Sequence, residues 1–117
     1  MSVDTITLGE IAHTRSGDKG NHANVGVIAY TPAGYEFLHQ QLTGQKVADY
    51  FASLAPTHVN RFELPRLSAL NFLLHNALAG GASQSLRIDT QGKLIGTSIL
   101  ELQLPRPQNL GSMLRQP

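Results

Sequence analysis

Three stretches of the chain show the apolar pattern of β-strands. Residues 3–12 alternate imperfectly between β-branched and polar side chains and are interrupted at Gly9. Residues 25–30 are apolar on both faces, which is typical of a central strand, and Gly26 leaves room beside the backbone. Residues 59–64 alternate cleanly. The pattern therefore predicts three strands before residue 65.

Three other stretches show helical spacing. Thr31 followed by Pro32 predicts the start of a helix, because threonine caps well and proline fits the first turn. A second helix is predicted from Thr43 onward. Its expected buried face consists of Val47, Tyr50, Phe51 and Leu54. A third apolar stripe over residues 67–78 predicts a helix that the Gly80-Gly81 pair ends.

The last part of the chain is predicted to form a hairpin and a tail. Residues 85–89 and 93–104 flank a Thr-Gln-Gly turn, although residues 93–98 also fit a helix. Interleaved strands and helices without a regular parallel repeat indicate an α+β fold. We expect a ferredoxin-like sandwich, with one mainly antiparallel sheet and its helices packed on one face. Residues 1–104 would form this domain, and residues 105–117 a proline-containing C-terminal tail.

Composition narrows the class of protein. The chain has 117 residues, 41% of them hydrophobic and only 15% charged, which favours one globular domain with some surface covered in an oligomer. Its net charge of +1 argues against nucleic acid or an anionic membrane as partner. The absence of cysteine excludes disulfides and thiolate chemistry. The first residues resemble no signal peptide, so we expect a cytoplasmic protein.

A polar segment, residues 13–24, stands between two predicted strands and is the candidate site. It is predicted to be a loop that binds an anionic small molecule. Arginine and lysine supply positive charge, glycines let backbone N–H groups converge on one anion, and asparagines add neutral donors. The predicted binding residues are Arg15, Ser16, Gly17, Asp18, Lys19, Gly20, Asn21, Asn24 and, outside the segment, Asn71. An ordinary turn is the alternative, but a hairpin turn needs only about two to five residues.

Acid–base groups are sparse. Lys19, Asp18 and His22 are the catalytic candidates, and His13 brackets the same segment. His75 lies four residues after Asn71, on the same side of the predicted third helix. No pair of histidines has the spacing of a helical metal site, and the sequence predicts neither a metal nor a cofactor.

One string is specific enough to indicate a family. Arg15-Ser16-Gly17-Asp18-Lys19-Gly20-Asn21, followed by Asn24-Val25-Gly26-Val27, resembles the start of the C-terminal domain of AtuA, the acyclic terpene utilisation protein. Further similar stretches follow in the same order, at residues 47–51, 62–65, 70–72, 80–81 and 85–87. The resemblance implies a ferredoxin-like domain that also occurs as a separate small chain beside a larger AtuA-type subunit. It implies a pathway that handles branched acyl-CoA compounds.

Three functions follow from these observations. The first is a small accessory subunit of an AtuA-type system in acyl-CoA or terpenoid catabolism, with a larger subunit or further copies of itself as partner. The second is a self-contained isomerase or lyase acting on acidic metabolites, with Lys19 or a histidine as base. The third is a structural module that only drives oligomerisation.

Overall fold

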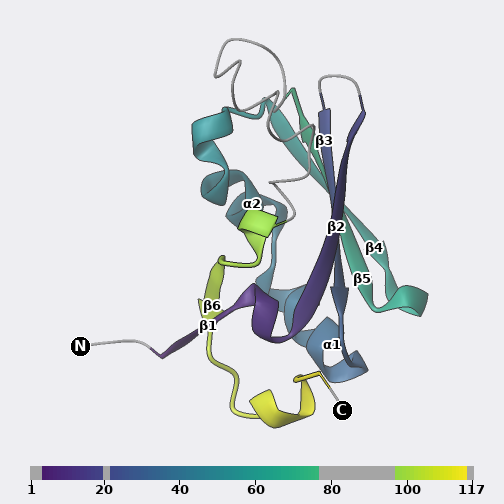
Figure 1. Cartoon of the computed structure of the whole chain (residues 1–117), viewed down its shortest axis with the longest axis vertical. Helices are drawn as coiled ribbons and strands as arrows, with labels where there is room; N and C mark the ends of the chain where they lie inside the picture. Colours follow the sequence, from purple (N-terminus) through teal and green to yellow (C-terminus); the bar gives the residue numbers. More distant parts are fainter. Residues whose placement is uncertain (1–3, 20–21, 77–96, 116–117) are drawn as a thin grey trace.

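The computed structural model of the chain describes residues 4–19, 22–76 and 97–115 (Figure 1). Within these residues, two antiparallel sheets, helices α1 and α2 and the helical residues 97–99 make up an α+β fold, as predicted. Within the described residues, no helix has the length and apolar character needed to cross a membrane.

The main sheet has four antiparallel strands in the order β2-β3-β5-β4. Their bounds are Ala12–Lys19 for β2, His22–Ala29 for β3, His58–Leu64 for β4 and Ala69–His75 for β5. A smaller sheet pairs β1, Thr5–Thr7, with β6, Gln103–Pro105. The strand predicted over residues 3–12 with an interruption at Gly9 is divided at that point, because a 3-10 turn, Leu8–Glu10, separates β1 from β2.

Both helices near the middle of the chain begin where their caps predict. Helix α1, Pro32–Gln41, starts after Thr31, whose hydroxyl accepts a hydrogen bond from the Gly34 N–H at 3.0 Å. Helix α2, Gly44–Tyr50, starts after Thr43, whose hydroxyl accepts from the Lys46 N–H at 3.0 Å. Each threonine thereby satisfies a backbone donor that the first helical turn leaves without a partner.

The second helix buries most of the predicted face. Val47, Phe51 and Leu54 are buried, but Tyr50 is exposed, which corrects the prediction for that residue. The Tyr50 hydroxyl donates a hydrogen bond to the Ser98 carbonyl at 2.6 Å, so its polar end reaches across to the C-terminal part of the chain.

The two faces of the main sheet have different environments. Alternate residues of β3 and β5, among them Val25, Val27, Leu70 and Phe72, are fully buried in the hydrophobic core. Residues of α1, α2 and the C-terminal segment complete that core, so the helices pack on one face of the sheet (Figure 1). The intervening residues form the other face, here called the open face, which no described helix covers.

Residues 13–24 do not form the predicted polar loop. Strands β2 and β3 pair continuously from Ala12↔Ala29 to Lys19↔His22, and only residues 20–21 between them lie outside the described residues. The alternation of β2 was hidden because its core-facing positions include Thr14 and Ser16, which are themselves polar. The polar character of the segment thus belongs to a sheet surface.

The helix predicted over residues 67–78 is also corrected, because the described part of this segment, residues 67–76, is not an α-helix. A 3-10 turn, Pro65–Leu67, leads through Ser68 at φ 52° into strand β5, which pairs with β3 on one side and β4 on the other. A short apolar-rich segment fits both the helical period and the strand period. Pairing with β3 and with β4 favours the strand here. The predicted stop at Gly80-Gly81 lies outside the described residues.

The C-terminal segment differs in part from the predicted hairpin. Residues 97–99 are helical, so residues 97 and 98 fit the helical alternative for residues 93–98, and within the described residues 97–104 the strand is limited to the first residues of β6. Residues 85–96 lie outside the described residues. The tail packs on its own domain, since Met113 is buried against the core.

Candidate functional site

The strand register places four rows of side chains across the open face. The row through Arg15 continues with Gly26, Asn71 and Phe62. The row on one side of it contains His13, Ile28, Ala69 and Leu64, and the row on the other side contains Gly17, Asn24, Leu73 and Asn60. The last row contains His22, His75 and His58, with Lys19 opposite His22 in the ladder. Residues distant in sequence therefore share one surface.

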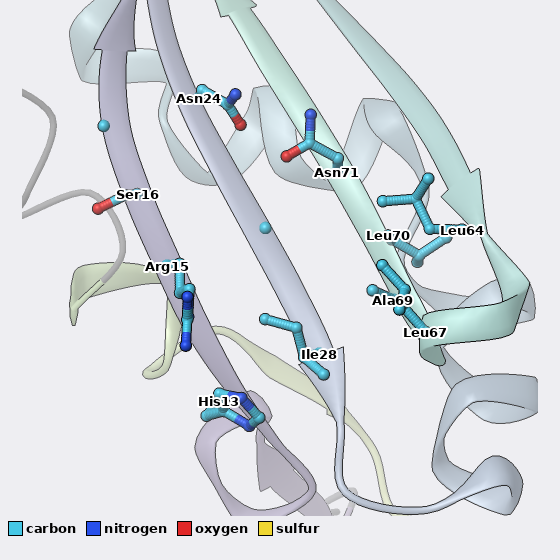
Figure 2. A pocket seen from close by; sticks show the side chains of 12 residues that line it. His13, Arg15, Ser16, Asn24, Ile28, Leu64, Leu67, Ala69, Leu70 and Asn71 are labelled. Atoms are coloured by element: carbon cyan, nitrogen blue, oxygen red, sulfur yellow. The ribbon is translucent and has the colours of Figure 1, made fainter.

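Residues of the first three rows, together with Ser16, Leu67 and Leu70, line a pocket of about 570 Å³, a size common for small-molecule sites (Figure 2). Twelve residues line it: His13, Arg15, Ser16, Gly17, Asn24, Gly26, Ile28, Leu64, Leu67, Ala69, Leu70 and Asn71.

The pocket has a polar side and an apolar side. His13 and Arg15 project from β2, and the side-chain amides of Asn24 and Asn71 lie at one end between β3 and β5 (Figure 2). Across from them, Leu64 and Leu67 are exposed by 41% and 66%, and Ile28, Ala69 and Leu70 complete the apolar side. An amphiphilic ligand would find a cation, two amides and a hydrocarbon surface within one pocket.

Gly26 forms part of the floor of the pocket. A Cβ atom placed on Gly26 would lie 3.6 Å from Asn71 Oδ1 and 3.7 Å from the Arg15 carbonyl oxygen. Both are ordinary contact distances, so the backbone does not require glycine here. Its effect is to keep the floor low, which lets a ligand lie against the sheet.

The structure brings together only part of the predicted site. Arg15, Ser16, Gly17, Asn24 and Asn71 line one pocket. Asn71 comes from β5, between β3 and β4, instead of from a helix.

Of the remaining predicted residues, the structure describes the side chain of His22 alone. Asp18 and Lys19 end strand β2. Gly20 and Asn21 lie outside the described residues. His22 is not among the lining residues and joins the histidine row instead.

Sequence reasoning missed the apolar side of the pocket and the partners of the histidines. In the sequence, the apolar side was indicated only by the strict alternation of residues 59–64, which puts Phe62 and Leu64 on the same face as Asn60. Leu67 was assigned to a buried helical stripe, yet it is the most exposed of the large hydrophobic residues described.

A hydrogen-bonded histidine row crosses the end of the open face next to Asn24. The rings of His22 and His75 have centroids 4.9 Å apart, and those of His58 and His75 lie 5.4 Å apart. The Asn60 amide bridges two of them, with Oδ1 2.6 Å from His75 Nε2 and Nδ2 3.0 Å from His58 Nε2. The Asn76 backbone N–H donates to His22 Nδ1 at 2.9 Å. Among the described residues, no three histidine or acidic side chains form a group suited to a metal ion.

Arg61 and Glu63 of β4 do not lie on the open face. They form ion pairs on the side of the sheet that faces the helices. Glu63 lies 3.1 Å from His39 Nε2 and 3.0 Å from Arg61, which also donates to the carbonyls of His39 and Leu42. The hydrogen bond from His39, followed by the charges of His39 and Arg61, lowers the pKa of Glu63. The described side chains of the open face, by contrast, include no carboxylate.

Comparison with known proteins identifies one family. The family model of the AtuA ferredoxin-like domain matches residues 6–105, which include the main sheet, all of the smaller sheet except Thr5, and the whole pocket. Searches among curated proteins and among solved structures gave no match.

Proposed function

The chain belongs to the AtuA ferredoxin-like domain family, and we propose that it binds an anionic acyl compound as an accessory subunit or domain of an AtuA-type system. The proposal places it in acyl-CoA or terpenoid catabolism, in the cytoplasm where CoA thioesters are used. The single observation that carries the proposal is the two-sided pocket, which offers Arg15 and two amides opposite a patch of leucines.

Each side of the pocket has a chemical role in this proposal. The guanidinium of Arg15 binds a carboxylate or phosphate through two parallel hydrogen bonds. The amides of Asn24 and Asn71 donate to a carbonyl or thioester oxygen. Ile28 and Leu67 contact the hydrocarbon chain, which removes exposed apolar surface from water.

The exposed apolar rim supports a protein partner as a second part of the proposal. Phe62, Leu64 and Leu67 are exposed by 48%, 41% and 66% and follow one another along β4 and the turn after it. An exposed apolar cluster of this kind is typical of a protein–protein interaction site. We propose that a larger AtuA-type subunit, or another copy of the chain, covers this rim.

Ligand binding tests the proposal directly. We would measure thermal shifts of the pure chain with octanoate, citronellate, octanoyl-CoA and inorganic phosphate. A ligand at about 100 times its dissociation constant adds about 2.7 kcal/mol of stability, a shift of several degrees for this size. Removing a hydrogen-bonded charge costs about 1.5–3 kcal/mol, so Arg15→Ala should weaken binding about 10- to 150-fold.

Two variants make the outcome specific. Arg106→Ala removes an exposed arginine that does not line the pocket, so it should bind as wild type does. Leu67→Ala should weaken octanoate but leave phosphate unchanged. Equal shifts in wild type and Arg15→Ala would refute the proposed site, and no shift with any ligand would favour a purely structural module.

A self-contained isomerase or lyase is the second candidate, because imidazoles stand one row beyond Asn24 on the same face. Turnover of an acid or thioester by the pure chain would establish it. Catalysis that requires an added larger subunit would favour the accessory role.

A further inference from the structure

Strand β4 lies at one edge of the main sheet, and among the described strands only β5 pairs with it. Its residues, His58–Leu64, face β5 in one unbroken ladder. The strand contains no proline and the ladder no bulge, two devices by which proteins protect such an edge. The N–H and C=O groups along its outer edge therefore offer a template for a further strand.

The exposed apolar side chains are concentrated at this edge. Phe62 and Leu64 are exposed, and both lie on the open face. Together with Leu67 they make up three of the five large hydrophobic residues that are exposed in the described part of the chain. Strand β2, at the other edge of the sheet, has none of them. The edge at β4 is therefore the better candidate for contact with another protein.

The charges of β4 lie on the side of the sheet that faces the helices. The Arg61 guanidinium donates to the carbonyls of His39 and Leu42 at 2.8 Å and 3.1 Å, which holds it at the end of α1. Glu63, two residues later, contacts His39 and Arg61 through the same oxygen, Oε2, and its side chain is 47% exposed. This side of the edge thus carries a fixed cation next to an accessible carboxylate.

A second copy of the chain fits this edge in one register. When two identical strands pair antiparallel about a two-fold axis, each residue before the axis stands opposite the residue equally far after it. An axis between the two Phe62 residues places Arg61 of each copy opposite the partner's Glu63. An axis at Arg61 or Glu63 places like charges opposite each other, and an axis elsewhere in β4 pairs neither charge. The charge pattern therefore favours the register centred on Phe62.

The surroundings of β4 limit the paired stretch in the same way. Pro65 follows the strand and has no N–H, so pairing ends at Leu64. In this register Leu64 stands opposite the partner's Asn60, so the pairing runs from Asn60 to Leu64 in each copy. Helix α2 approaches the strand just before this stretch, because a Cβ atom placed on Gly44 would lie 3.6 Å from the Val59 carbonyl oxygen. The register therefore pairs the part of β4 that neither the proline nor α2 limits.

We propose that two copies of the chain pair through β4, so that their four-stranded sheets join edge to edge in a two-fold symmetric dimer. The two Phe62 rings meet at the axis, and two reciprocal Arg61–Glu63 pairs join the copies on the side of the helices. Both open faces lie on the same side of the joined sheet, so the partner's Asn60 stands beside Leu64 at the apolar side of the pocket. As the partner that covers the rim, the second copy rests on the proposed function, but the pairing itself requires no ligand.

A cysteine cross-link tests the register, because the chain contains no cysteine of its own. Phe62→Cys places two thiols at the axis, where opposite Cβ atoms lie about 4.5–5.5 Å apart, close to the distance that a disulfide spans. Leu64→Cys is the matched control at a similarly exposed residue. Its two thiols stand four positions apart along the strands, or about 14 Å. In a glutathione redox buffer, Phe62→Cys should form a disulfide-linked dimer and Leu64→Cys should stay unlinked.

Sedimentation of the unmodified chain measures the dimer itself, in a concentration series upward from about 1 μM, the weak end of the affinities of standard interfaces. We expect a reversible equilibrium between monomer and dimer. Phe62→Glu puts two carboxylates about 6 Å apart at the axis. At an effective dielectric constant between about 20 and 80, their repulsion raises the dissociation constant about 3- to 100-fold.

The ion pairs are tested by charge reversal. Glu63→Lys replaces both opposite-charge pairs by like-charge pairs and should also weaken the dimer. Glu101→Lys makes the same change of charge at an exposed residue outside the main sheet, so it should leave the dissociation constant unchanged.

Three results would overturn the dimer. The first is a chain that sediments as a monomer at every concentration. The second is Leu64→Cys that cross-links as readily as Phe62→Cys. The third is a dimer that neither Phe62→Glu nor Glu63→Lys weakens, because such a dimer must use another surface.

Failure of the dimer and failure of the pocket are distinguishable, because Phe62 and Glu63 do not line the pocket. A monomer whose Tm rises with octanoate keeps the pocket and refutes only the pairing. A dimer whose Tm no ligand raises keeps the pairing and refutes the ligand site of the proposed function.

Discussion

Gly26→Ala should raise the stability of the folded chain and weaken ligand binding. In β3 the added methyl group would point into the pocket, 3.6 Å from Asn71 Oδ1 and 3.7 Å from the Arg15 carbonyl, so no neighbour has to move. Gly26 has no positive φ that an L-residue would resist. The folded state therefore tolerates alanine, while the unfolded chain loses backbone freedom.

The expected effects of Gly26→Ala on stability and on ligand binding have opposite signs. Replacing glycine at a compatible position stabilises by about 0.4–1 kcal/mol, which corresponds to a rise of about 2–4 °C in Tm for a chain of this length. A methyl group on the floor of a pocket where a ligand must pack costs about 1–3 kcal/mol, or about 5- to 150-fold in Kd.

The assay combines thermal unfolding without ligand and calorimetric titration with octanoate. Gly44→Ala is the matched control, because its Cβ would also find its nearest neighbour at 3.6 Å, but in α2 and away from the pocket. We expect Gly44→Ala to bind as wild type does. A lower Tm for Gly26→Ala would refute the steric argument, and unchanged binding would show that the ligand does not use the floor.

Three other predictions concern the fold. Thr31→Ala removes the cap of α1 and should cost about 1 kcal/mol in urea unfolding; an unchanged midpoint would mean that the cap is dispensable. The hydrogen bond from His39 lowers the pKa of Glu63, so its stabilising effect is present above the ordinary value of 4.5 and is lost as pH falls through the lowered value. Glu63→Gln should make the fall of Tm with decreasing pH less steep. An equally steep fall would contradict the assignment of this effect to Glu63. Burial, followed by the charge of Glu63, raises the pKa of Tyr35, so stability should fall as pH rises above 10.0, and Tyr35→Phe should remove that loss; identical alkaline unfolding would argue against it.

The helix starts were determined by local sequence. Thr31-Pro32 and Thr43 act within one turn, through hydrogen bonds to residues three positions on. Such interactions need no distant partner, so they can be predicted from neighbouring residues alone. The string from Arg15 to Asn21 likewise sufficed to indicate the family that the comparison then showed.

The identity of β5 depended on its neighbours in space. Leu70, Leu74 and the apolar residues after them fit a helical stripe, yet Leu70, Phe72 and Leu74 are the positions that the sheet buries. A segment with apolar residues at both spacings follows the element that satisfies its backbone, and here β3 and β4 provide partners on both sides.

In the candidate site, too, some features were determined by the sequence and others only by the tertiary structure. The sequence by itself determined the residue types near Arg15 that suit an anion, together with the caps and the apolar strands. Only the tertiary structure decided that these residues lie on a sheet, that Asn71 joins them through Gly26, and that Leu64 and Leu67 supply a hydrocarbon surface opposite. The physical reason is that strand register, fixed by burial of alternate side chains in the core, sets which distant residues share the open face.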